Sequence, residues 1–142
     1  MTEIELRQYT SIKREIDDLE KRIEKEYGKE ITAVAGKVKG SMRCFPYTEV
    51  RTSVLLEDPT ELATRDKLIA TREKKKKELE AKALEIETFI NSIEESELRL
   101  IFRYRFIDGL RQTEVGNLVN LDRSRISRKI SDYLQNAHKA QK

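Results

Sequence analysis

The sequence has few of the residues that build metal centres, disulfides and nucleophilic active sites. Its 142 residues include one cysteine, Cys44, and one histidine, His138. A single cysteine excludes an intramolecular disulfide and a multi-cysteine metal site. A single histidine near the C-terminus excludes sites that need several imidazoles or a histidine base, and no glycine-rich phosphate loop is present. We therefore expect no enzymatic activity, no metal, no cofactor and no small-molecule ligand.

Long apolar runs are also absent. No stretch approaches the roughly 18 apolar residues that a membrane-spanning helix needs. The N-terminal MTEIELRQYT lacks the charged and then apolar layout of a signal peptide. We therefore expect a cytoplasmic protein that makes no membrane contact.

Proline and aromatic residues are scarce, whereas charged residues are abundant. The chain has two prolines, no tryptophan, 6% aromatic residues and 39% charged residues, which is typical of long solvated helices. The net charge is only +3, but residues 1–93 hold 19 basic and 19 acidic residues, and residues 120–142 hold six and two. This C-terminal positive excess is the charge distribution expected of a nucleic-acid-binding segment.

Two long helices are predicted in residues 1–92. The first covers residues 2 to about 28, and the second begins at Asp58-Pro59, where aspartate can cap and proline suits the first turn. Apolar residues recur at three- and four-residue spacing, as in a coiled-coil seam. They are Tyr9, Ile12, Ile16, Leu19 and Ile23 in the first helix, and Leu62, Ile69, Leu79, Ala83, Ile86 and Ile90 in the second.

Matching seams predict that the two helices form an antiparallel helical hairpin. Such a hairpin is marginally stable alone, so we expect a homodimer in which a second copy completes a four-helix bundle. Ser92-Ile93-Glu94-Glu95 has the form of a capping box and predicts a new helix after a bend. The bend marks the expected boundary between a dimerisation region, 1–92, and a second region, 93–142.

Residues 29–57 interrupt the helical pattern. Glycine, serine and proline punctuate this segment, and Val50, Thr52, Val54 and Leu56 alternate with period two. An extended or short β insert is therefore predicted. Phe45-Pro46-Tyr47 is expected to be extended because of its proline, and it has two interpretations, a cover for the end of the hairpin or a docking site for a partner.

The C-terminal third contains three short apolar-periodic segments separated by two breaks. They carry Leu98, Ile101, Phe102 and Phe106, then Val115, Leu118 and Val119, then Ile126, Ile130, Tyr133 and Leu134. A helix of about seven residues, a tight turn and a basic helix make the layout of a helix-turn-helix. The predicted fold is thus mainly all-α.

The turn of this motif has suitable residues. Asn120 can take the left-handed position after the first helix, and Asp122 stands where its side chain can cap the second. Leu121 is expected to point inward. Gly116, in the preceding helix, allows a close helix contact but lowers helix propensity by up to about 1 kcal/mol.

These residues resemble a known family. LRLIFRYRFIDGLRQTEVGNLVNLDRSRISRKISDYL is similar to region 4 of bacterial sigma-70 factors, which reads the −35 promoter element. The whole chain resembles small phage and prophage proteins that share three motifs, here Val38-Lys39-Gly40-Ser41, Phe45-Pro46-Tyr47 and Phe89-Ile90-Asn91-Ser92-Ile93. Members are described as transcriptional regulators akin to late-gene activators of the ArpU and RinA type. The resemblance implies a regulator in a bacterial host cell, with a sigma region 4-like domain at 93–142.

Three positions depart from the region 4 pattern. Region 4 usually has serine or threonine capping the first helix of the motif, where this chain has Arg111. We therefore expect Gln112 or Thr113 to cap instead. Gly116 stands where alanine is usual, and Asn120 replaces the usual glycine of the turn.

The predicted recognition helix covers residues 123–135. Helical geometry places Ser124, Arg125 and Arg128 opposite the apolar side, where they can enter the major groove and arginine can bridge O6 and N7 of guanine. Phosphate contacts are expected from Arg123, Ser127 and Lys129, with backbone contacts from Gln112 and Thr113. Other arginines, expected as solvated surface or as contacts to polymerase, are Arg99, Arg103, Arg105 and Arg111.

Three functions remain open from the sequence. The first is a sequence-specific transcription regulator that binds double-stranded DNA, with host RNA polymerase as a further candidate partner. The second is a small terminase subunit, which can also join a helix-turn-helix to a coiled coil. The third is an interaction module that binds polymerase or a sigma factor without reading DNA. A dimer favours the first function, and a ring-forming oligomer favours the second.

Overall fold

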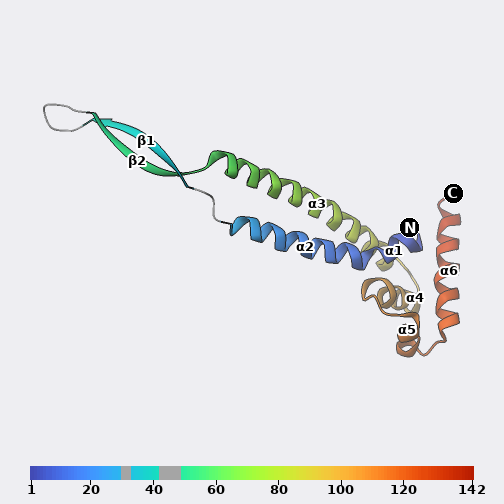
Figure 1. The fold of residues 1–142 in the computed structure, drawn as a ribbon. Coiled ribbons are helices and arrows are strands. Elements are labelled where there is room, and N and C mark those ends of the chain that lie inside the picture. Colours follow the sequence, from blue (N-terminus) through green and yellow to red (C-terminus); the bar gives the residue numbers. More distant parts are fainter. Residues whose placement is uncertain (30–32, 42–48) are drawn as a thin grey trace. The chain divides into compact units, whose positions relative to one another are not determined.

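The computed structural model describes residues 1–29, 33–41 and 49–142, and their side chains in 1–29 and 58–142. The described chain is mostly helical, as predicted. Its elements in order are α1 (Glu3–Arg7), α2 (Tyr9–Tyr27), β1 (Ala33–Ser41), β2 (Glu49–Glu57), α3 (Pro59–Asn91), α4 (Ser96–Phe102), the π-helical turn η1 (Arg103–Ile107), α5 (Gln112–Val119) and α6 (Arg123–Ala140) (Figure 1). No helix in these described ranges is long and apolar enough to cross a membrane.

The chain divides into two compact units. We call Met1–Glu20 with Lys75–Lys142 the terminal unit, and Lys21–Lys74 the middle unit. The functional boundary expected between residues 92 and 93 falls inside the terminal unit. That boundary stays a prediction. Ile90 and Ile101, on its two sides, belong to the same hydrophobic core.

The middle unit contains the two strands. β1 and β2 pair antiparallel, in register from Ala33 opposite Glu57 to Ser41 opposite Glu49. They fall within the segment 29–57, where an extended or β insert is expected. Cys44 and the Phe45-Pro46-Tyr47 motif lie outside the described residues.

In the middle unit, α3 begins at the position that the sequence predicts. The Asp58 carboxylate accepts a hydrogen bond from the backbone N–H of Thr60 at 2.9 Å, and Pro59 is the first helical residue. The start of α3 therefore has the cap expected of Asp58. Further along, the Arg72 guanidinium forms an ion pair with the Glu26 carboxylate of α2, at 3.3 Å.

The first predicted helix is divided in two. α1 ends at Arg7 and α2 begins at Tyr9. α1 starts with a capping box, in which the Thr2 hydroxyl accepts from the Glu5 N–H at 3.3 Å and the Glu5 carboxylate accepts from the Thr2 N–H at 2.6 Å. This local signal fixes the start of α1 at Glu3, which seam spacing alone does not predict.

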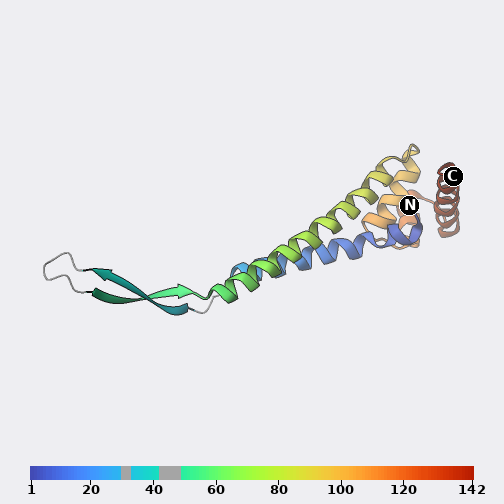
Figure 2. The same ribbon diagram turned by 90° about the horizontal axis from the view of Figure 1, so that it is seen from above.

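Within the terminal unit, α2 and α3 run side by side in opposite directions (Figure 2). The Tyr9 hydroxyl donates to the Glu87 carboxylate, and Lys76 pairs with Glu20 at 2.8 Å. Rising numbers on α2 thus meet falling numbers on α3. The seam side chains buried here are Tyr9, Ile12 and Ile16 on α2 and Leu79, Ala83, Ile86 and Ile90 on α3.

One hydrophobic core joins the first and last helices of the terminal unit. Its fully buried large side chains are Leu6, Ile90, Ile93, Ile101, Phe102, Val115, Ile126 and Ile130. Phe102 contacts the ring of Tyr133 on α6 edge-on, with 5.5 Å between centroids. This core holds α6 against α4 and α1 beside both.

The connection from α3 to α4 differs from its prediction. The Ser92 hydroxyl donates to the Phe89 carbonyl at 2.6 Å, and α4 begins after Glu95, whose side chain makes no capping bond. The capping box predicted at Ser92 is therefore wrong. The serine instead closes the last turn of α3, since a free carbonyl there needs a donor.

Candidate nucleic-acid interface

The turn between α5 and α6 has the predicted left-handed residue. Asn120 has φ 55° and ψ 42°, a conformation that asparagine tolerates better than most residues. The N–H groups of Asn120 and Leu121 both donate to the Gly116 carbonyl, the second at 3.0 Å. These bonds close α5 and reverse the chain toward α6.

Asp122 occupies the predicted N-cap position of α6 but does not cap with its side chain. Its backbone is extended, and its carbonyl accepts from the Ile126 N–H at 3.1 Å. No side-chain capping bond is present. The predicted position is right, and the predicted carboxylate bond is wrong.

Gly116 is required by the turn. A Cβ atom built on it would lie 2.4 Å from the Leu121 carbonyl oxygen, far inside a normal contact. Leu121 is partly buried against the core, as predicted. The close approach that glycine permits is therefore to the turn that follows.

The start of α5 is shifted from its prediction. Arg111 is the residue before the helix, with φ −70° and ψ 153°, and Gln112 is the first helical residue. The Arg111 N–H donates to the Glu114 carboxylate at 2.7 Å. Neither Gln112 nor Thr113 caps the helix, so that expectation is wrong. Leu118, predicted on the apolar face of α5, is 57% exposed.

α6 presents a buried side and an exposed side. Ile126, Ile130 and Leu134 are buried in the core, as their spacing predicts. Of the predicted site residues, those exposed are Arg123, Ser124, Arg125, Arg128 and Thr113, and those half-buried are Ser127, Lys129 and Gln112.

Arg125 and Arg128 lack partners within the described chain. Neither guanidinium makes a hydrogen bond or ion pair with any residue that the structure describes. Each guanidinium offers five N–H donors. They are therefore available to a ligand along the first turns of α6.

Lys129 has acidic partners from a distant segment. Its ammonium group lies 3.2 Å from the Glu97 carboxylate and 3.4 Å from that of Glu95. The hydrogen bond to Glu97, with further contributions from Glu95, raises the pKa of Lys129. The charge of Lys129 is thus partly balanced within the protein, unlike those of Arg125 and Arg128.

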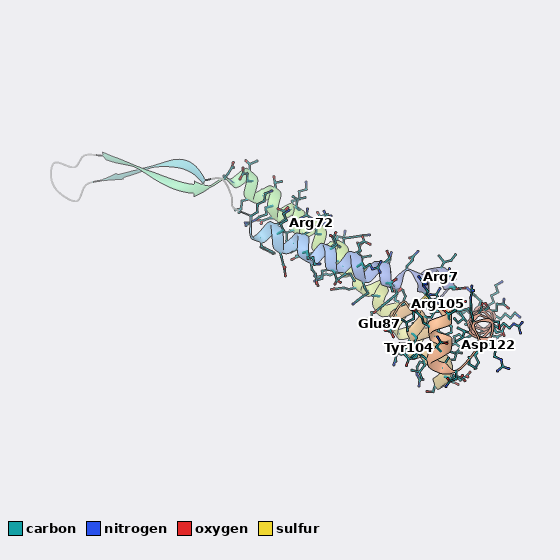
Figure 3. The ribbon with its side chains drawn as sticks, turned by 60° about the horizontal axis from the view of Figure 1, so that its bottom comes forward. Arg7, Arg72, Glu87, Tyr104, Arg105 and Asp122 are labelled. Atoms are coloured by element: carbon teal, nitrogen blue, oxygen red, sulfur yellow. The ribbon has the colours of Figure 1, made fainter. Side chains whose placement is uncertain are left out.

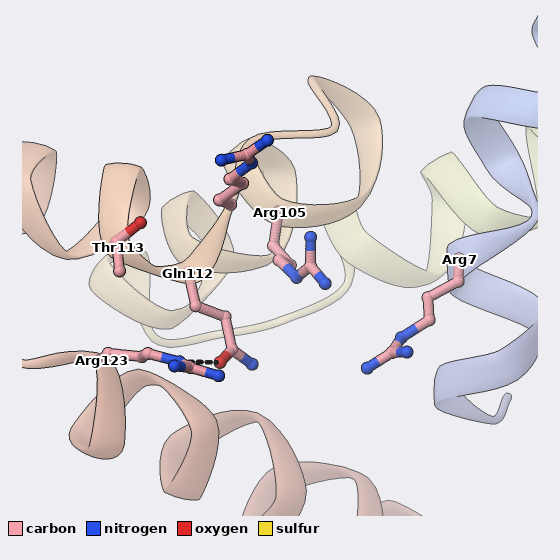
Figure 4. A pocket seen from close by; sticks show the side chains of 6 residues that line it. Arg7, Arg105, Gln112, Thr113 and Arg123 are labelled. Atoms are coloured by element: carbon pink, nitrogen blue, oxygen red, sulfur yellow. Dashed lines mark hydrogen bonds between the residues drawn. The ribbon is translucent and has the colours of Figure 1, made fainter.

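Three of the predicted site residues meet in one pocket of about 460 Å³ (Figure 4). They are Gln112, Thr113 and Arg123, and the Arg123 Nε donates to the side-chain amide oxygen (Oε1) of Gln112 at 3.5 Å. The remaining lining residues are Arg7, Arg105 and Arg111. The sequence does not predict Arg7 as a site residue, because only tertiary packing brings α1 to this pocket.

The described residues contain no candidate metal site. No group of three or more His, Cys, Asp or Glu side chains converges within them to hold a metal ion. Comparison of the chain with protein-family models, curated proteins and solved structures returns no match.

Proposed function

We propose that the chain is a sequence-specific, double-stranded DNA-binding phage transcription regulator. Residues 123–135 of α6 would lie in the major groove, with α5 and α6 acting as a sigma region 4-like helix-turn-helix. The observation that carries this proposal is the exposed row of Ser124, Arg125 and Arg128 on the first turns of α6. The opposite side of the same helix is fixed in the core by Ile126 and Ile130.

This arrangement suits direct reading of bases. An arginine guanidinium can donate two hydrogen bonds to O6 and N7 of guanine. The side chains of Arg125 and Arg128 are both exposed and available for such bonds. Since the core fixes α6, the helix backbone loses little conformational freedom when the arginines meet a groove. Arg123, Ser127, Gln112 and Thr113 would contact the sugar-phosphate backbone and set the register.

A homodimer is part of this proposal, with residues 1–92 as the dimerisation region and host RNA polymerase as a further candidate partner. Helix-turn-helix proteins commonly read two half-sites as dimers. The seam residues Ile12, Ile16 and Ile86 are buried within a single chain. The dimer contact must therefore use surfaces other than this part of the seam.

The test is selection of duplex DNA from a random library, followed by binding measurements on the selected sequence and a shuffled copy. We expect the wild type to prefer the selected sequence and Arg125→Ala/Arg128→Ala to lose that preference. A matched control is Lys13→Ala/Arg14→Ala, which removes two exposed cations from α2. Failure to enrich any sequence, with polymerase binding intact, would favour the interaction module over a DNA reader.

A further inference from the structure

The pocket at the start of α5 has an unusual charge. Four of its six lining side chains are arginines, Arg7, Arg105, Arg111 and Arg123, and the other two, Gln112 and Thr113, are neutral. No carboxylate is among them. Four guanidinium groups around one space repel one another, and an anion placed between them would relieve this repulsion.

Arg105 is the most constrained of the four. Its Nη1 donates to the Leu110 carbonyl at 2.9 Å, whereas its Nε is buried and has no hydrogen-bond partner in the described chain. The residue lies in the π-helical turn η1, where the Asp108 N–H donates to the Arg103 carbonyl at 3.0 Å. A partly buried guanidinium with an unmet donor is a place where a charged acceptor gains binding energy.

Arg7 reaches the pocket from α1 (Figures 3 and 4). The neighbouring Leu6 is fully buried in the core, which fixes α1 beside the C-terminal helices. The Arg7 guanidinium pairs with Glu3 on its own helix at 2.6 Å. An exposed ion pair of this kind contributes little, so Arg7 can exchange it for a ligand.

Arg111 and Arg123 are exposed and face the pocket from α5 and α6. In the close-up, the Gln112–Arg123 pair lies across the space from Arg7 (Figure 4). Arg123 is followed directly by Ser124 and Arg125, the first residues of the proposed reading face. The pocket and that face therefore both include residues from the first turn of α6.

We propose that this pocket binds a phosphate group, and that on DNA the group is a backbone phosphate beside the bases contacted by α6. Planar guanidinium groups match phosphate oxygens in bidentate geometry, and Gln112 and Thr113 add neutral donors. The N-terminal helix α1 thus becomes part of the DNA-binding surface. The identification of this group as a DNA phosphate rests on the proposed function. The affinity of the pocket for a phosphate group does not.

The experiment compares Arg7→Gln/Arg111→Gln with wild type. Both side chains are exposed, so the substitutions should leave folding intact, which circular dichroism checks. The control Lys13→Gln/Arg14→Gln removes the same charge from another exposed surface. Affinity for duplex DNA is measured over a range of salt concentrations, and affinity for inorganic pyrophosphate is measured without DNA.

The expected result is a salt dependence whose slope falls by about 1 in the pocket variant, since each lost phosphate contact removes roughly 0.9 from the slope. The loss should be equal on selected and shuffled DNA, and the control should keep the wild-type slope. Pyrophosphate binding should weaken in the pocket variant alone.

The remaining outcomes separate this inference from the proposed function. An unchanged slope in the pocket variant, with Arg125→Ala/Arg128→Ala still losing sequence preference, overturns the pocket and leaves the function standing. Pocket-dependent pyrophosphate binding by a wild type that ignores DNA supports the phosphate site and contradicts the DNA reader. Binding of neither ligand overturns both.

Discussion

Gly116 and Asn120 together determine how the chain turns from α5 into α6. Asn120 supplies the left-handed backbone, with φ 55°, and Gly116 leaves room for the Leu121 carbonyl. The sequence predicts the role of Asn120 because left-handed positions favour a few residue types. It predicts a close helix contact at Gly116, whereas the close contact is to the Leu121 carbonyl in the turn.

Substitution Gly116→Ala should destabilise the protein by about 1–3 kcal/mol, because a Cβ would overlap backbone that cannot move freely. The gain in helix propensity, up to about 1 kcal/mol, is too small to offset this. Urea unfolding measures the change. Gly28→Ala is the control, since a Cβ there lies 3.6 Å from the nearest atom, the Glu24 carbonyl oxygen. Equal stability of Gly116→Ala and wild type would contradict the tight turn.

Tyr9 links α2 to α3 through a hydrogen bond from its hydroxyl to Glu87. The tyrosine is 5% exposed. Burial, together with this bond, raises the pKa of Tyr9 from 10.0 to about 12. Folding therefore favours the protonated phenol. The resulting stability is complete below pH 10 and is lost as pH rises from about 10 towards 12.

Tyr9→Phe should be less stable than wild type at pH 8, by roughly 1.5–3 kcal/mol for a bond to a charged acceptor. This difference should shrink as the pH passes 10, because the wild type loses the contribution that the variant never had. Urea unfolding across this pH range measures both. The control is Tyr27→Phe, since Tyr27 is 60% exposed. A stability difference that stays constant with pH would argue against the Tyr9–Glu87 bond.

At the scale of elements, the periodicity of α6 predicts its buried side but not the partners of its polar residues. Ile126, Ile130 and Leu134 recur at four-residue spacing and are buried. The ion pairs of Lys129 with Glu95 and Glu97 join segments more than 30 residues apart, so no local pattern reports them. Arg128 and Lys129 are neighbouring cations that look alike in the sequence. In the structure Lys129 has ion-pair partners, whereas Arg128 has none among the described residues.

Arg128→Ala should weaken DNA binding more than Lys129→Ala does. The Arg128 guanidinium has no partner among the described residues, whereas Lys129 is held by two carboxylates. Fluorescence anisotropy with the selected duplex compares the two variants directly. If Lys129→Ala weakens binding as much as Arg128→Ala, the ion pairs with Glu95 and Glu97 do not prevent Lys129 from contacting DNA.

The same contrast explains which parts of the fold and the interface follow from the sequence. Helix spans and turn residues depend on neighbours, so Asp58, Pro59 and Asn120 mark their elements correctly. The arginine pocket depends on tertiary packing, which brings Arg7 of α1 to Arg105 and Arg111. The spacing of residues along the chain cannot predict that these arginines lie together.

At the scale of the whole molecule, the proposed homodimer would connect residues 1–92 to the proposed reading of DNA. A two-fold dimer presents two copies of α6, and paired half-sites multiply the affinity of each. The single-chain core already buries Leu6, Ile12 and Ile86. A dimer would therefore add contacts to a folded chain and would not be needed to create its core.

Sedimentation equilibrium should give twice the chain mass of 16.7 kDa. Selected DNA sites should then show two related half-sites, because the symmetry of the protein is copied in its target. A ring of many copies would favour the terminase alternative. A monomer at all concentrations would contradict the dimer and predict a single, unpaired site.

The central claim is that Arg125 and Arg128 read bases. The most direct measurement is the ratio of affinities for selected and shuffled duplex DNA, in wild type and in Arg125→Ala/Arg128→Ala. Each arginine–guanine pair contributes about 1–3 kcal/mol of discrimination, so the ratio should fall by at least roughly tenfold in the variant. A wild-type ratio near one, or a ratio that the double substitution leaves unchanged, would contradict the claim.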